Sequence, residues 1–144
     1  MLRPYPRLGR PNRQGPTTVV RMTGIGELSG VALDCPDPAA LAAFYSELTG
    51  LPVVYTSPDW CSIGERVDSP FHLSFQRSPQ YRPPTWPDPH SSMQAHLHVR
   101  VPSLEAAEQA AVGLGAKVLR REENSFRVMA DPAGHIFCLC PTRP

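Results

Sequence analysis

An internal duplication constrains the fold of this chain more than any other feature of its sequence. The segment 30–54, GVALDCPDPAALAAFYSELTGLPVV, aligns with the segment 96–119, HLHVRVPSLEAAEQAAVGLGAKVL, at an offset of 66 residues. The matching positions are Pro36 with Pro102, Ala40 with Ala106, Leu48 with Leu114 and, after one deleted residue, Gly50 with Gly115. A pattern that recurs at a fixed spacing is typical of a repeated supersecondary unit, so the chain is predicted to contain two copies of one unit.

Each copy carries the boundary signals of a helix between two strands. Asp37 is expected to cap a helix whose first residue is Pro38, and Ser103 is expected to cap the second helix. Gly50 and Gly115 suit the left-handed residue with which a helix ends. In the first copy the apolar positions recur at helical spacing and should pack on a sheet; they are Leu41, Phe44, Tyr45 and Leu48.

Short apolar runs after each helix predict three further strands per copy. They lie at about 51–56, 59–64 and 71–77, and at about 116–120, 124–129 and 135–140. The predicted fold class is therefore α+β, with two tandem βαβββ modules. One domain at 28–141 is expected, with module 1 at about 28–77, a proline-rich linker at 78–92 and module 2 at about 93–141.

Residues 1–26 differ from the rest in composition. They contain five arginines, four prolines and no acidic residue, which predicts a disordered tail, or an upstream extension if Met22 is the natural start.

The remaining residues hold nine basic and thirteen acidic side chains, so a nucleic-acid partner is not expected. No apolar run approaches a membrane span and no export signal is evident, so a cytoplasmic protein is expected. Its four cysteines then need not pair.

The motifs resemble those of the vicinal oxygen chelate superfamily, which includes glyoxalase I, extradiol dioxygenases and bleomycin-resistance proteins. The resemblance covers about residues 28–141 and is carried by VALDCPDPAALAAFYSELTGLPV, FRVMADPAGHIFCLC and the linker FQRSPQYRPPTWPDP. It implies that the two modules form a curved mixed sheet around a central cavity, with helices on the convex side. We expect a small-molecule ligand in that cavity and a homodimer.

The resemblance also implies where a divalent ion would bind in metal-dependent members. The corresponding positions here are Gly30, Ser74, His96 and Cys138. Glycine has no side chain and serine is a poor neutral ligand, so we expect the family's metal centre to be lost and no cofactor to be required. A zinc site of His96 and Cys138 with Cys140 or His98 is an alternative, although Cys-x-Cys on one strand is an uncommon zinc spacing.

Alternate residues of a strand point to the same face, and this alternation predicts which polar side chains face the cavity. His96 is a candidate general base or, equally, a hydrogen-bonded pocket histidine. Cys138 and Cys140 share one wall, whereas Cys35 has the opposite parity and should lie under the first helix. The candidate ligand-binding residues are Trp60, Ser74, Gln76, His98, Arg100 and Cys138.

Several of these candidates have equally ordinary structural roles. Arg100 can simply reach solvent, Gln76 can bond to the linker, and Trp60 can belong to the core. The linker residues Tyr81 and Trp86 could form a lid over the cavity, pack between subunits, or belong to a spacer.

Two functions remain open on the sequence. The first is a binding protein for a small metabolite or drug-like molecule, without the family's metal. The alternative is an enzyme, a lyase, isomerase or dioxygenase, that has an atypical metal site or uses His96 as a base.

Overall fold

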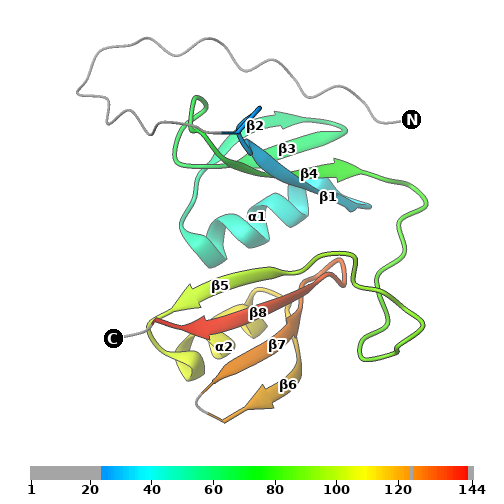
Figure 1. Cartoon of the computed structure of the whole chain (residues 1–144), viewed down its shortest axis with the longest axis vertical. Coiled ribbons are helices and arrows are strands. Elements are labelled where there is room, and N and C mark those ends of the chain that lie inside the picture. Colours follow the sequence, from blue (N-terminus) through cyan, green and yellow to red (C-terminus); the bar gives the residue numbers. More distant parts are fainter. Residues whose placement is uncertain (1–23, 124, 143–144) are drawn as a thin grey trace.

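The computed structural model describes residues 24–123 and 125–142, so nearly all of the predicted tail lies outside the described part. Two βαβββ modules follow one another, as predicted (Figure 1). In the first module the elements are β1 (Gly30–Cys35), α1 (Pro38–Thr49), β2 (Val53–Ser57), β3 (Trp60–Ile63) and β4 (His72–Arg77). In the second they are β5 (Leu97–Val101), α2 (Leu104–Gly113), β6 (Lys117–Glu122), β7 (Phe126–Ala130) and β8 (Ile136–Pro141).

The strands form two four-stranded sheets of identical topology, with the orders β1-β4-β3-β2 and β5-β8-β7-β6. In each sheet the first and last strands of the module pair in parallel and the remaining pairs are antiparallel. The helical crossover after the first strand permits this parallel pairing, and short turns suffice for the antiparallel pairs. The α+β fold class is confirmed, and the strands are hydrogen-bonded as two separate sheets.

The helix boundaries follow the sequence signals. The Asp37 side chain accepts a hydrogen bond from the Ala40 amide, and Pro38 begins α1. Ser103 caps α2 in the same way through the Ala106 amide. Gly50 has a φ of 75° at the end of α1, which a residue with a side chain adopts only with strain. At the end of α2 the capping residue, Leu114, has a right-handed conformation. The left-handed residue is the next one, Gly115.

The hydrophobic core runs through both modules. α1 packs on the first sheet, and its aromatic residues also contact the second module; in Figure 1 the helix lies between the first sheet and β5 and β8. Tyr45 stacks on Phe75 with ring centroids 5.5 Å apart, and Phe137 of β8 lies edge-on to Tyr45 at 6.1 Å. Phe44 contacts Phe137 in turn at 5.9 Å. Cys35 is fully buried in this core, as its parity predicted.

A polar cluster that includes the buried side chains of Tyr45 and Asp131 connects the modules through the turn before β8. The Tyr45 hydroxyl donates to Oδ2 of Asp131 at 2.7 Å. Nδ1 of His135 lies 3.0 Å from the same oxygen, and its Nε2 lies 2.8 Å from the Asp34 carbonyl oxygen in the first module. Burial, followed by the Asp131 charge, raises the pKa of Tyr45, so its hydroxyl keeps its proton. We call these four residues the intermodule cluster.

The linker packs on the second module. Tyr81 stacks on the His135 ring at a centroid distance of 4.8 Å. Pro83 contacts Gly134 so closely that a Cβ at this glycine would lie 2.5 Å from the proline Cβ. Further along, Trp86 and Met93 pack against a small apolar cluster on the second sheet. The linker is therefore fixed over one face of module 2 and is not only a spacer.

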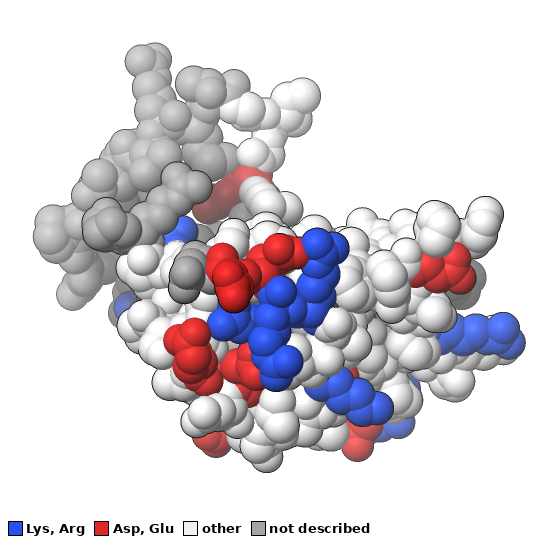
Figure 2. Space-filling view, turned by 90° about the horizontal axis from the view of Figure 1, so that it is seen from below, with Lys and Arg blue, Asp and Glu red and all other residues white. Residues whose placement is uncertain are grey.

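Charged residues of both signs alternate on the face of the molecule shown in Figure 2. Glu108 of α2 receives hydrogen bonds from Arg121 and Arg127, and Arg127 also pairs with Glu105. A basic stripe for nucleic acid is thus not present on this face. No helix within residues 24–123 and 125–142 is long and apolar enough to span a membrane.

Candidate functional site

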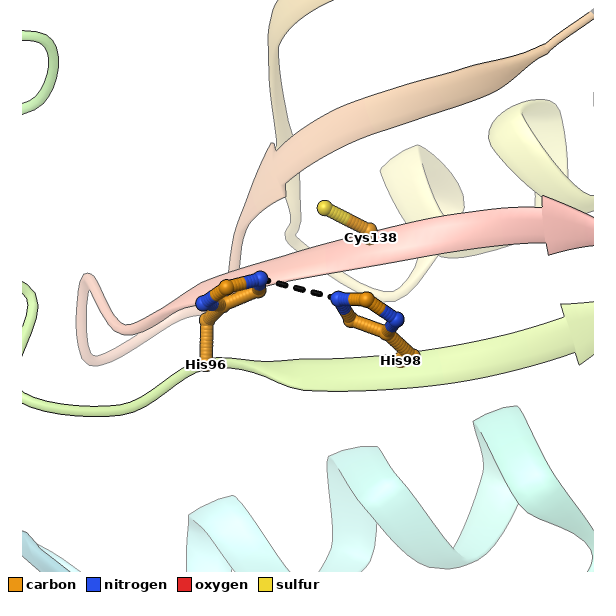
Figure 3. A group of neighbouring side chains, drawn as sticks. All are labelled: His96, His98 and Cys138. Atoms are coloured by element: carbon orange, nitrogen blue, oxygen red, sulfur yellow. Dashed lines mark hydrogen bonds between the residues drawn. The ribbon is translucent and has the colours of Figure 1, made fainter.

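Two neighbouring strands bring three candidate residues together on one face of the second sheet. The parallel register of β5 and β8 places His98 opposite Cys138, and His96 lies directly before β5 with its ring beside that of His98. The alternate residues Leu97 and Val99 pack against the core on the other face. Figure 3 shows the two imidazole rings turned toward each other, with the Cys138 side chain beside them. Strand alternation therefore predicted this arrangement correctly.

The three side chains are close enough to act as one polar group. Nε2 of His96 and Nε2 of His98 are 2.8 Å apart, a hydrogen-bond distance that requires one nitrogen to donate and the other to accept. One ligand atom from each histidine and Sγ of Cys138 all lie within 4.8 Å of one another. Both imidazoles are exposed and Cys138 is partly buried. Within the described part of the chain no carboxylate hydrogen-bonds to either imidazole.

The two cysteines of β8 form the adjoining wall. Cys138 and Cys140 are both free and both partly buried, and both line the pocket described next. Burial, and to a lesser extent the neighbouring Cys140, raises the pKa of the Cys138 thiol. A raised pKa keeps this thiol neutral at physiological pH, which makes it a poor nucleophile in the absence of a cation.

These residues line a pocket of about 310 Å³, which we call the module 2 pocket. Its histidines and cysteines occupy one side, and apolar side chains make up the remainder. Trp86 comes from the linker, and Met93 lies directly after it. The complete lining is Trp86, Met93, His96, His98, Phe126, Val128, Ile136, Cys138 and Cys140.

Some lining residues were missed on the sequence. Phe126 and Val128 of β7 line the pocket, whereas Arg127 between them is buried on the opposite face and pairs with α2. The alternation in FRVMA contains this information, because a strand sends every second side chain to the same face. The position of Met93, directly after the linker, depends on the path of the chain before β5 and has no such local signal.

Three predicted site residues lie on the first sheet and do not line the module 2 pocket. Ser74 is 1% exposed, and its hydroxyl lies 2.8 Å from that of Ser62. The Trp60 indole donates to Ser62 at 2.9 Å, so these three groups satisfy one another. Gln76 donates a long hydrogen bond of 3.4 Å to Asp34. The structure thus groups His96, His98 and Cys138, and separates Trp60, Ser74 and Gln76 from them.

Arg100 occupies the next position on the histidine face of β5. It pairs in register with Cys140 and its side chain is exposed. It lies beside the module 2 pocket without lining it.

Comparison with known proteins shows which family this chain belongs to and which solved structures share its fold. The family model described as a glyoxalase-like domain matches residues 30–140, which includes both modules and the linker. The chain belongs to the glyoxalase-like domain family. No curated protein matches the sequence of this glyoxalase-like protein.

Solved structures share its fold at low sequence identity. A glyoxalase/bleomycin resistance protein/dioxygenase family enzyme from Burkholderia phytofirmans PsJN has a TM-score of 0.63 and 16% identity, covering 82% of this chain and 100% of its own. A bleomycin resistance determinant encoded on transposon Tn5 has a TM-score of 0.52 and 18% identity, covering 83% and 100%. Glyoxalase I of Leishmania major has a TM-score of 0.57 and 13% identity, covering 81% and 86%.

The metal centre implied by the superfamily does not fit this glyoxalase-like protein. A Cβ at Gly30 would lie 2.6 Å from the backbone oxygen of His72, so no side chain fits at that position without a shift of the strand. The Ser74 hydroxyl is buried against Ser62 and is therefore not available as a ligand. Only His96 and Cys138 offer metal-binding atoms at the four positions.

Proposed function

We propose that this glyoxalase-like protein binds a small, largely apolar molecule in the module 2 pocket. The observation that carries the proposal is the composition of the lining, in which apolar side chains surround one polar side made of His96, His98 and the two β8 cysteines. Ligand sites in proteins typically combine an apolar cavity with a few convergent polar groups. The volume of about 310 Å³ is at the lower end of the range for such sites and suits a molecule of one or two rings.

The apolar part of the pocket favours a flat ligand. Trp86 of the linker and Phe126 of β7 both line the pocket with aromatic rings. Aromatic rings pack against flat, apolar groups with more free energy than burial alone provides. The linker contacts at Tyr81 and Pro83 hold the segment that carries Trp86, so this wall is formed before a ligand arrives.

The polar side favours a ligand with a carbonyl or anionic group. The two imidazoles can donate N–H groups, and no carboxylate within the described residues competes for them. Arg100 adds a positive charge next to Cys140. A ligand that covers His96 and accepts its hydrogen bond gains about 1–2 kcal/mol from that contact.

The test is a thermal-shift screen of small aromatic and carbonyl compounds on the full chain, followed by calorimetry of the best ligand. Trp86→Ala and His96→Ala should each weaken binding, by about 5- to 30-fold for a loss of 1–2 kcal/mol. Trp60→Phe and His90→Ala are the matched controls, because neither residue lines the pocket. Equal affinities in wild type, Trp86→Ala and His96→Ala would contradict the proposal.

An enzymatic function is the second candidate, and the short distance between His96 and His98 favours it. Two imidazole nitrogens at 2.8 Å can pass a proton between them, so His96 could take a proton from bound substrate with His98 as its partner. Such a step removes a proton from an acidic C–H next to a carbonyl and returns it to the same or a neighbouring atom. Ligand incubated with the protein in D₂O would exchange that hydrogen, and His96→Ala would abolish the exchange while reducing affinity only modestly.

We also propose that the protein is a cytoplasmic homodimer. The outer strands β2 and β6 carry the exposed apolar residues Val53 and Leu119, which a second copy could cover. The four free cysteines are compatible with a reducing compartment. Sedimentation equilibrium of the full chain would measure the oligomeric state, and a monomer at micromolar concentration would contradict the dimer.

A further inference from the structure

We propose that His96, His98 and Cys138 form a zinc-binding site built entirely from module 2. This site differs from the superfamily's arrangement, because it requires no residue of module 1 and uses His98 as a ligand. It goes beyond the binding function proposed above and does not depend on it.

The geometry of the three residues supports a common ion. Tetrahedral zinc, with Zn–N of about 2.0–2.1 Å and Zn–S of about 2.3 Å, places its ligand atoms roughly 3.3–3.6 Å apart. The two Nε2 atoms are now 2.8 Å apart, and the ligand atoms of the three side chains all lie within 4.8 Å of one another. Small side-chain rotations therefore suffice to reach coordination distances. Both imidazoles are exposed, so such rotations do not disturb the packed core.

The backbone holds the ligands in the required arrangement. His98 and Cys138 are direct register partners in the parallel β5–β8 pair, and His96 lies directly before β5, two residues ahead of His98. All three side chains project from the same side of these strands, as Figure 3 shows. Two of the three ligands therefore lie on paired strands, which keep side chains in place better than loops do, and the third lies at the start of one of them.

The donor set selects the class of metal. Two imidazoles and one thiol suit zinc and similar transition ions, whereas magnesium and calcium require oxygen ligands. Three protein ligands leave the fourth position of a tetrahedral ion open, as in catalytic zinc sites. Here that position would adjoin the apolar lining of the module 2 pocket, which includes Val128 and Ile136.

The experiment uses the full chain without a histidine tag, stripped of metal with a chelator and then titrated with Zn²⁺ or with Co²⁺ as a spectroscopic probe. Elemental analysis after gel filtration should give one ion per chain. Bound Co²⁺ should show the intense visible bands of tetrahedral coordination and a thiolate-to-cobalt charge-transfer band. Cys138→Ser should remove the charge-transfer band, and His96→Gln and His98→Gln should each weaken Zn²⁺ binding by roughly 10- to 100-fold or more.

One exposed histidine provides the matched control. His90→Gln removes a linker histidine that is outside the pocket lining. This variant should bind one ion with wild-type affinity, and circular dichroism of every variant should confirm the fold. The proposal is overturned if wild type binds no stoichiometric ion, if the charge-transfer band persists in Cys138→Ser, or if His98→Gln binds as tightly as wild type.

Failure of the zinc site would leave the ligand-binding proposal untouched. The thermal-shift screen is performed on chelator-stripped protein, so binding of an organic ligand there does not depend on zinc. Conversely, zinc binding with no organic ligand at the pocket would support the metal site and contradict the binding function.

Discussion

Replacing Tyr45 with phenylalanine removes one hydroxyl from the intermodule cluster and leaves the ring packing in place. That hydroxyl donates a 2.7 Å hydrogen bond to Asp131, whose side chain is fully buried. The ring stacks on Phe75 and contacts Phe137, and phenylalanine can keep both contacts. The substitution therefore isolates the energetic contribution of a hydrogen bond between the two modules.

The expected loss is about 2 kcal/mol of the free energy of unfolding. Hydrogen bonds to charged groups contribute roughly 1.5–3 kcal/mol. Asp131 keeps its other partners, since Oδ2 still faces Nδ1 of His135 and Oδ1 still accepts the Ala133 amide, so the upper end of that range is not reached. For a domain of this size, about 2 kcal/mol corresponds to a decrease in Tm of roughly 6–10 °C.

Urea unfolding monitored by circular dichroism, together with a thermal melt, measures this loss. The control is Tyr55→Phe, because Tyr55 is only partly buried on β2 and its hydroxyl has no hydrogen-bond partner among the described residues. We expect the control to change stability by less than about 0.5 kcal/mol. Wild-type stability in Tyr45→Phe, or an equal loss of stability in Tyr55→Phe, would show that this hydrogen bond does not stabilise the contact between the modules.

Three further predictions concern strain and pH. Gly30→Ala should lower stability by about 1–3 kcal/mol in urea unfolding, because its Cβ would lie 2.6 Å from the His72 backbone oxygen; a neutral substitution would show that a ligand side chain fits there. The hydrogen bond from Arg121 lowers the pKa of Glu108, so the unfolded state binds more protons in acid and stability should fall as pH decreases below about 4.5. Glu108→Gln should flatten that acid limb in pH-dependent melts, and an unchanged limb would refute the assignment. Burial raises the pKa of Cys35 from 9.0 to about 12, so between these values the folded state holds the proton that the unfolded state has lost. Stability should therefore decline with rising pH in this window, by at most about 1.4 kcal/mol per pH unit, and Cys35→Ala should reduce that slope relative to wild type.

The fold was predictable from the sequence because its determinants are local and repeated. The capping residues Asp37 and Ser103 fix where each helix begins, and the glycines Gly50 and Gly115 mark the turns that follow. The six strands predicted after the helices begin and end within two residues of the observed ones. The small differences arise because an apolar run passes into a turn without a sharp chemical signal.

The candidate site was only partly predictable, for a physical reason. Alternation along a strand tells which residues share a face, and this grouped His96, His98 and Cys138 correctly. It does not tell which faces of different modules meet, so Trp60 and Gln76 were assigned to a shared cavity although they do not line the module 2 pocket. The position of that pocket depends on how the linker folds over module 2, and this path is set by tertiary contacts such as that of Pro83 with Gly134.

A crystal structure of the full chain with the strongest ligand from the thermal-shift screen would locate the binding site. We expect the ligand to lie in the module 2 pocket, with its apolar body against Trp86 and its polar group within hydrogen-bond distance of His96 or His98. A ligand bound to the face of the first sheet, beside Trp60 and Gln76, with the module 2 pocket empty, would contradict it.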